Sequence, residues 1–322
     1  GPIQVIPEVV ELGPNTSLLD SFEAFREMPY PALLDSADGA SPLGRFSYLT
    51  ADPFLVLRSK GRRVEIEAGG VVRVLDGDPF LALRDVLSGF ALSPAPGLPP
   101  FQGGAIGYLS YELAHHLEVL PSRAVDDLDL PEMCVGLYDW VISRDGATGR
   151  AWAVATGLPD GARDGARERL RWVDDCLRGP RPAGRSETPL HRPAGITSNF
   201  TRDGYLKAVE AVKAYIYEGD VYQANISQRF EGALTCDPWE LYLRLRQANS
   251  EPFAAFLLYP ELAVLSASPE EYLRLANGEA STRPMKGTRP RGDTPAADRL
   301  MAADLRASEK DRAENVMIVD LM

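Results

Sequence analysis

Short apolar segments, separated by turn residues, fill the first half of the chain, and their spacing constrains the fold more than any other feature. The segments that we expect to form strands are 32–35, 46–50, 54–58, 64–67, 71–74, 104–109, 134–142 and 151–155. Most of the connections between them are too short to hold a crossover helix. Neighbouring segments should therefore pair antiparallel, as hairpins and meanders.

Helices are expected between blocks of strands rather than in alternation with single strands. Amphipathic or capped stretches predict helices at 16–27, 77–90, 162–177, 201–218, 237–245 and 310–322. Further strands are expected at 221–230, 253–259 and 262–268, and a hairpin around Asn277-Gly278. Strands and helices that come in blocks indicate an α+β fold.

Residues 179–199 contain four prolines and few apolar side chains, which is typical of a linker. This linker divides the chain into a predicted N-terminal domain at 3–178 and a predicted C-terminal domain at 200–322. The last apolar-periodic stretch runs to Met322 without a capping residue. We therefore expect the C-terminal domain to be incomplete, and the 322-residue chain to be inactive by itself.

Composition excludes several classes of function. The formal net charge of -12 argues against nucleic acid as a partner. No apolar run is long enough to span a membrane, and no charged-then-apolar leader stands at the front. Cys134, Cys176 and Cys236 are unevenly spaced and form no CxxC motif, so neither a disulfide framework nor a zinc site is predicted. A cytoplasmic location fits these features.

Residues 283–292, here called the lysine loop, have the sequence Arg-Pro-Met-Lys-Gly-Thr-Arg-Pro-Arg-Gly. Its prolines and glycines oppose regular structure, so Lys286 should lie in a rigid irregular loop. Three arginines surround this lysine in an acidic protein. Such a loop suits an anionic small molecule, and crowded cations favour release of a lysine proton.

Five motifs, in one order along the chain, resemble those of the chorismate-utilising enzymes. They are 268–270 (Ser-Pro-Glu), 284–292 (Pro-Met-Lys-Gly-Thr-Arg-Pro-Arg-Gly), 310–315 (Lys-Asp-Arg-Ala-Glu-Asn), 219–225 (Gly-Asp-Val-Tyr-Gln-Ala-Asn) and, near the front, 33–36 with 44–47. The resemblance implies a two-lobed fold in which antiparallel β-sheets pack face to face with helices outside. It also implies chorismate as the substrate.

The resemblance assigns chemistry to two residues. Lys286 matches a position that is lysine in aminodeoxychorismate synthases and typically alanine in anthranilate synthases. In the former, this lysine is the proposed nucleophile that attacks the chorismate ring. Glu270 matches the general acid that protonates the departing hydroxyl, because hydroxide is a poor leaving group.

Other matches concern binding. Gln223 stands where isochorismate and salicylate synthases carry the lysine that activates water, and a neutral amide cannot act as that base. Gly287 and Thr288 are expected to contact the substrate. Glu314 resembles one ligand of the family's Mg²⁺, the expected cofactor, and one glutamate alone is a partial site.

A second site is implied at the front of the chain. Leu34, Ser36, Arg45 and Phe46, together with Pro252-Phe253, resemble the family's tryptophan pocket. In anthranilate synthases this pocket serves feedback inhibition; in aminodeoxychorismate synthases it holds tryptophan structurally or is empty. Bound tryptophan is therefore a possible partner, and plain packing of these residues is the alternative.

Within the family, the residues favour an aminodeoxychorismate synthase component I of the p-aminobenzoate and folate pathway, an enzyme of the transaminase class. The alternatives are an anthranilate synthase component I and a non-catalytic tryptophan-binding homologue or inactive fragment. None of the three cysteines lies in a Gly-x-Cys-x-Gly elbow. Ammonia is therefore expected from a glutamine amidotransferase, as a separate subunit or as a fused domain.

Overall fold

The computed structural model describes residues 1–14, 16–37, 43–180 and 195–321. The chain forms two compact units, one of Gly1–Ala183 with Leu245–Met322 and the other of Gly184–Arg244. Most of the predicted linker at 179–199 lies outside the described residues. The linker and the domain boundaries drawn from it therefore remain predictions.

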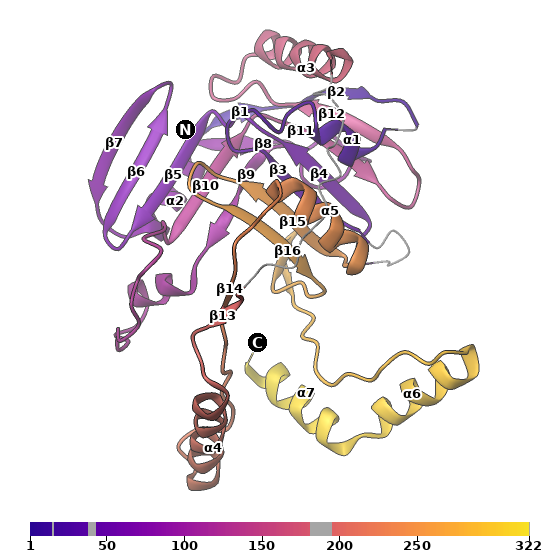
Figure 1. Ribbon diagram of the computed structural model, residues 1–322. Coiled ribbons are helices and arrows are strands. Elements are labelled where there is room, and N and C mark those ends of the chain that lie inside the picture. Colours follow the sequence, from indigo (N-terminus) through magenta and orange to yellow (C-terminus); the bar gives the residue numbers. More distant parts are fainter. Residues whose placement is uncertain (15, 38–42, 181–194, 322) are drawn as a thin grey trace. The chain divides into compact units, whose positions relative to one another are not determined.

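The first unit contains a seven-stranded sheet (Figure 1). Every neighbouring pair in it is antiparallel, as the strand spacing predicts. In spatial order its strands are β16 (Ala263–Ser268), β15 (Phe253–Leu258), β3 (Ala32–Asp35), β4 (Phe46–Thr50), β11 (Trp140–Asp145), β12 (Ala151–Ala155) and β2 (Glu8–Glu11). One sheet thus combines strands from the two ends of the sequence.

A five-stranded antiparallel sheet completes the main framework of this unit. Its spatial order is β7 (Val71–Asp76), β6 (Arg63–Ala68), β5 (Leu55–Lys60), β10 (Met133–Tyr138) and β9 (Gly104–Leu109). Smaller pairings join β1 (Ile3–Val5) to β8 (Phe90–Leu92) and β17 (Arg274–Ala276) to β18 (Glu279–Ser281).

The two large sheets share a hydrophobic core. Ala32 and Leu257 from the seven-stranded sheet pack in one cluster with Val56, Ile106 and Cys134 from the five-stranded sheet. Such a cluster requires the inner faces of both sheets to meet, which confirms the predicted packing of antiparallel sheets. A second cluster lies between the five-stranded sheet and α2 (Pro79–Leu87).

One continuous apolar segment, 133–142, contributes a strand to each of the two large sheets. We expected a single strand at 134–142, but the run divides into β10 and β11 at Asp139. Directly after this point Trp140 is fully buried and donates its indole N–H to the carbonyl of Ala51 at 2.8 Å. The buried carboxylate of Asp139 accepts a hydrogen bond from Arg169 at 3.0 Å.

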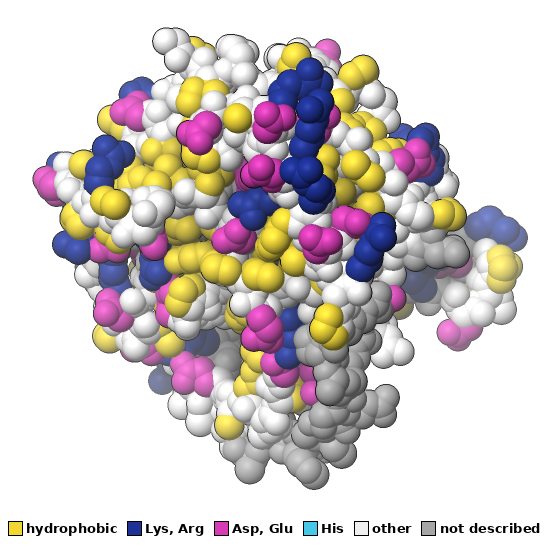
Figure 2. Space-filling view, turned by 90° about the horizontal axis from the view of Figure 1, so that it is seen from above, with side chains coloured by type: hydrophobic (Ala, Val, Ile, Leu, Met, Phe, Trp, Pro, Cys, Tyr) yellow, Lys and Arg dark blue, Asp and Glu magenta, His cyan; other side chains and the backbone are white. Residues whose placement is uncertain are grey.

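Helices of the first unit include α1 (Leu18–Phe22), η1 (Tyr111–His116), α3 (Arg163–Arg178), α6 (Pro295–Ala307) and α7 (Glu309–Leu321). Helix α3 packs against β12, β2 and β11 (Figure 1). Figure 2 views the molecule from the side of α3, and basic side chains alternate with acidic ones there. No single sign of charge dominates this face.

The structure differs from the sequence expectations at three further places. The chain from 221 to 229 has no regular structure, and a two-residue strand, β14 (Phe230–Glu231), pairs with β13 (Thr197–Ser198). Helix α1 is shorter than 16–27. Helix α6 was not predicted, although Pro295 at its first position and the Thr294 cap, whose hydroxyl accepts from Ala297 N at 3.2 Å, are ordinary start signals.

The second unit contains α4 (Arg202–Glu218), which begins and ends as predicted. The Thr201 hydroxyl accepts from Gly204 N at 3.1 Å, and Gly219 ends the helix at φ 84°. Helix α5 (Pro238–Ala248) begins in this unit and its last residues belong to the first. None of the described helices is long and apolar enough to cross a membrane.

Candidate functional site

The lysine loop has the irregular backbone that its prolines and glycines predict. It runs between β18 and α6 without helix or strand. Lys286 is half-buried, and it has no hydrogen-bond or ion-pair partner among the described residues. Its ammonium group is therefore held by no carboxylate of this part of the chain.

Two of the loop's three arginines, Arg289 and Arg291, are not the free cations that the sequence suggests. Arg289 pairs with Asp304 at 2.5 Å and with Asp311 at 3.1 Å. Arg291 forms a two-pronged pair with Asp298 at 2.6 and 2.7 Å. These carboxylates neutralise both guanidinium groups, so the expected crowding of cations around Lys286 is largely cancelled.

Glu270 lies two residues after the end of β16 and is exposed. A local turn fixes its backbone, because its N–H donates to the Ser268 hydroxyl at 3.3 Å and that hydroxyl donates to its carbonyl at 3.2 Å. No hydrogen bond or ion pair joins Glu270, Lys286 and Glu314 within the described residues. Their roles therefore stay predictions.

Glu314 lies on α7, partly exposed. No group of three or more His, Cys, Asp or Glu side chains that could hold a metal ion occurs in the described ranges. Magnesium takes several oxygen ligands. Glu314 therefore offers one carboxylate, and the residues described here do not form a complete magnesium site.

The three other residues predicted to contact substrate lie in different units: Gly287 and Thr288 belong to the first unit and Gln223 to the second. Gly287 follows Lys286 at φ +71°, and Thr288 is exposed. Gln223 belongs to the second unit, where it is half-buried in irregular chain. The position of Gln223 is therefore described only relative to the other residues of the second unit.

A cavity of about 420 Å³ in the first unit contains five of the six residues predicted for the tryptophan pocket. Leu34, Ser36, Phe46, Pro252 and Phe253 all line it. They come from three segments that the seven-stranded sheet brings together, since β3 pairs with both β4 and β15. The residues predicted here therefore form a spatial cluster that lines one cavity.

Close backbone contacts build the cavity wall. A Cβ at Gly44 would lie 2.9 Å from Pro252 Cβ, so a larger residue would push these segments apart. The Ser36 hydroxyl donates to the carbonyl of Phe46 at 2.6 Å. Arg45, the sixth predicted residue, does not line the cavity: its guanidinium lies 4.9 Å from the Phe46 ring centre and pairs with Asp145.

Two features of this cavity, the contribution of a hairpin and the ion pair of Asp35, were missed from the sequence. The hairpin segment Leu273 to Ala276, next to the predicted turn at Asn277-Gly278, forms part of the lining. Asp35 is buried at the cavity and pairs with Arg246 of α5. The hairpin could have been included, because the Asn277-Gly278 turn signal is strong and its first strand, β17, comes shortly after β16.

The cavity combines an aromatic interior with a few charges. Burial raises the pKa of Tyr48, another lining residue, to about 12, so its phenol is neutral at physiological pH. Glu271 and Arg274 add one charge of each sign. An apolar cavity with both charges present suits a zwitterion that carries a flat apolar group.

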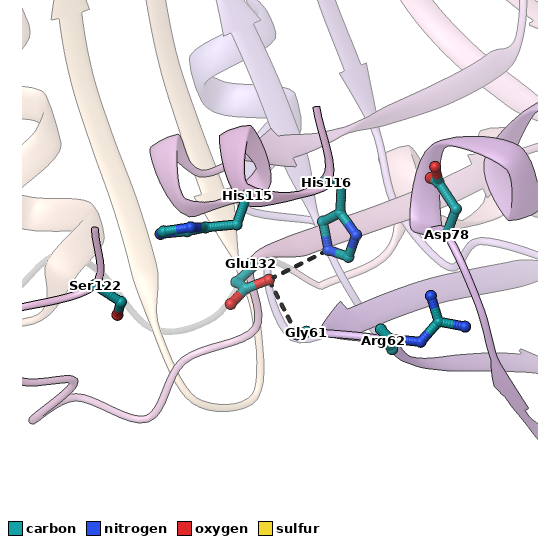
Figure 3. Close-up of a pocket in the computed structure, with 7 residues that line it drawn as sticks. All are labelled: Gly61, Arg62, Asp78, His115, His116, Ser122 and Glu132. Carbon is teal, nitrogen blue, oxygen red and sulfur yellow. Dashed lines mark hydrogen bonds and ion pairs between the residues drawn. The ribbon is translucent and has the colours of Figure 1, made fainter. Parts of the chain in front are cut away.

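A second cavity, of about 440 Å³, is lined mainly by polar and charged residues, among them His115, His116 and Glu132 (Figure 3). His116 Nε2 lies 3.9 Å from Glu132 Oε2, which also accepts from Gly61 N at 3.0 Å. His115 points away from His116, as expected for adjacent residues (Figure 3). No metal-binding cluster forms there among the described residues, and His191 lies outside them.

Comparison with known proteins decides the family. The family model described as chorismate binding enzyme matches residues 47–322, which is most of the chain. The chain belongs to the chorismate binding enzyme family. This membership agrees with the five motifs and with the face-to-face sheets.

Relatives in this family carry two different names. The chain is 38% identical over 302 residues to aminodeoxychorismate synthase component 1 of Salmonella typhimurium, covering 94% of this chain and 64% of that protein. It is 36% identical over 301 residues to anthranilate synthase component 1 of Streptomyces coelicolor, covering 90% and 55%. The chain therefore spans less than two thirds of these chorismate binding enzymes.

A solved structure confirms the fold. Anthranilate synthase component I from Streptococcus pneumoniae superposes with a TM-score of 0.72 at 26% identity, covering 87% of this chain and 61% of that one. The α+β architecture of this chorismate binding enzyme is thus shared with a characterised member of the family.

Proposed function

We propose that the full-length protein is component 1 of an aminodeoxychorismate synthase, which converts chorismate and ammonia to 4-amino-4-deoxychorismate. Lys286 carries this proposal, because a lysine at this place in the motif provides a nucleophile that an alanine does not. The 38% identity to a relative of that name supports it. The difference from the 36% of the anthranilate synthase relative is small, so the lysine has more weight.

The proposed reaction proceeds in two displacements. The neutral amine of Lys286 bonds to C2 of chorismate, the two ring double bonds shift, and the C4–O bond breaks. Glu270 donates a proton to the departing oxygen, which leaves as water. Ammonia then bonds to C4, the double bonds shift back, and the C2–N bond breaks to return the lysine.

A half-buried lysine without a carboxylate partner supports the first step. An ion pair would favour the protonated form, which has no lone pair for attack. Lys286 has no such partner in the described part of the chain. Arg289 and Arg291 beside it are paired with carboxylates, so they add little repulsion at Lys286.

We propose that ammonia comes from a glutamine amidotransferase. Cys134 is buried, and burial raises the pKa of its thiol to about 12, so it is not a thiolate at neutral pH. Burial also raises the pKa of Cys176. Neither provides the activated cysteine that glutamine hydrolysis needs.

Magnesium and tryptophan are the remaining proposed partners. Glu314 would give one carboxylate to Mg²⁺, with substrate oxygens and water among the other ligands. The 420 Å³ cavity would hold tryptophan, its indole among Leu34, Phe46 and Phe253. We propose a cytoplasmic location, and either folate precursor synthesis or a secondary pathway would use the product.

Product analysis tests the function. The full-length protein is incubated with chorismate, Mg²⁺ and ammonium, and the products are separated by chromatography. We expect 4-amino-4-deoxychorismate. Anthranilate as the sole product would identify an anthranilate synthase component, and bound tryptophan without any turnover would identify a non-catalytic homologue.

A further inference from the structure

Asp311 lies against the backbone that directly follows Lys286. A Cβ built on Gly287 would be 2.8 Å from Asp311 Cγ and 2.9 Å from its Oδ1. Gly287 has φ +71°, a conformation that other residues rarely adopt. The Asp311 side chain therefore occupies the space that a side chain at 287 would need.

The same carboxylate also reaches the loop two residues further on. Asp311 Oδ2 lies 3.1 Å from Arg289 Nη2. The Asp311 side chain is only 16% exposed, whereas Asp304, the other partner of Arg289, is 63% exposed. Asp304 lies closer to Arg289, but water screens that pair, whereas the pair with Asp311 is shielded from solvent.

The orientation of Asp311 is set by the start of α7. Its backbone N–H donates to the Ser308 hydroxyl at 3.3 Å. A hydrogen bond from Ser308 and the charge of Arg289 lower the pKa of the Asp311 carboxyl, so it is ionised at neutral pH. An anion in the first turn of a helix is also favoured by the helix dipole.

The far end of the lysine loop has an independent anchor on α6. Asp298 accepts from Arg291 at 2.6 and 2.7 Å and from Gly292 N at 3.1 Å. A Cβ on Gly292 would lie 2.2 Å from Asp298 N, so this end is also in close contact with a helix. The loop is thus fixed at two points, and Asp311 is the one next to Lys286.

We propose that Asp311 is a positioning residue that fixes the lysine loop to α7 and thereby sets the place of Lys286. That Lys286 reacts with chorismate rests on the proposed function; the anchoring does not. A nucleophile must be held in a narrow geometry to attack efficiently. Asp311 would act on the reaction through Gly287 and Arg289, without touching the substrate.

Three variants of the full-length protein test this inference. Asp311→Ala removes both contacts, Asp311→Asn keeps the packing on Gly287 without the charge, and Asp304→Ala is the matched control on the same arginine. Hydrogen exchange of peptides covering 283–292 is measured without substrate. Turnover with chorismate and ammonium gives kcat and KM separately.

We expect exchange in the loop to accelerate strongly in Asp311→Ala, less in Asp311→Asn and little in Asp304→Ala. We expect kcat to fall by up to about 100-fold in Asp311→Ala, because a small misplacement of a reacting group can slow the reaction that much, with KM for chorismate little changed. Unchanged exchange in Asp311→Ala, or an equal effect of Asp304→Ala, would overturn the inference. If the wild type makes no aminodeoxychorismate, the proposed function fails, while hydrogen exchange still decides the role of Asp311.

Discussion

Arg45 and Asp145 form a two-pronged ion pair, with Arg45 Nε 2.9 Å from Oδ1 and Nη2 2.7 Å from Oδ2. Asp145 is buried at the end of β11, and Arg45 stands just before β4. The Arg45 hydrogen bond lowers the pKa of Asp145 to about 2. This pair holds together two strands of the sheet that carries the 420 Å³ cavity.

Removing the arginine should make stability less sensitive to acid. The folded pKa of Asp145 is about 2 and an unfolded aspartate titrates near 3.9. The ion pair therefore stabilises the fold fully above about pH 4, and this contribution is lost as pH falls towards 2. Arg45→Met should be less stable than wild type at pH 7, and the difference should shrink by pH 3.

Urea unfolding followed by tryptophan fluorescence measures this difference. Arg62→Met is the matched control, since Arg62 and Asp76 form an exposed pair, at 66% and 78% exposure. A difference between Arg45→Met and wild type that is the same at pH 3 and at pH 7 would contradict the assignment.

Ligand binding in the cavity is tested by filling it. We expect L-tryptophan to raise the melting temperature of the full-length wild type. Ala255 lines the cavity, so Ala255→Phe should abolish the shift by occupying the space, without removing a polar contact. Ala263→Phe, on the neighbouring strand β16 and outside the lining, should keep it. A shift that survives in Ala255→Phe would place tryptophan elsewhere.

Burial of Trp140 makes a prediction about stability. Its ring packs against Phe25 and Trp172 at centroid distances of 4.8 and 5.6 Å, and its N–H satisfies the buried Ala51 carbonyl. Trp140→Phe leaves that carbonyl unpaired and opens space, which should lower the free energy of unfolding by about 2–4 kcal/mol. Val74→Ala, at an exposed position of β7, should change it by less than about 0.5 kcal/mol. Equal losses in both variants would refute the assigned role of Trp140.

Much of the fold was predictable because the apolar residues of each segment alternate with the period of the strand or helix that they form. Most strands of both sheets, though not β2, and the helix caps at Thr201 and Gly219 followed from alternation and capping residues. The strand expected at 221–230 failed because a short apolar pattern alone cannot provide a partner strand. The break at Asp139 was not predicted either, and the sequence does not show that the carboxylate of this residue is buried against Arg169 of α3.

For the candidate site, too, some residue positions followed from the sequence and others did not. The residues of the tryptophan motif meet because the strands that carry them pair in register, so pattern and position agree. Arg45 was misplaced because the sequence does not show that Asp145, a hundred residues away, takes its guanidinium. The role of Asp311 depends on the fold of α7 against the loop, which no local pattern reveals.

The proposed general acid makes a kinetic prediction. Glu270→Gln in the full-length protein should reduce kcat for amination of chorismate by about 10²- to 10⁴-fold, because an amide cannot donate the proton that the leaving oxygen needs. Glu271→Gln is the adjacent control and should have little effect on kcat. Steady-state kinetics at saturating ammonium compare them. Similar losses in both variants would remove the special role of Glu270.

The most direct test of the account is to trap the intermediate on Lys286. The full-length protein is mixed with chorismate and Mg²⁺ in the absence of ammonia, digested, and mapped by mass spectrometry. We predict an adduct of chorismate less water on Lys286 in the wild type. Lys286→Arg should show none, because a guanidinium stays protonated and cannot attack. An unmodified Lys286, or an adduct on another residue, would contradict the covalent role of this lysine.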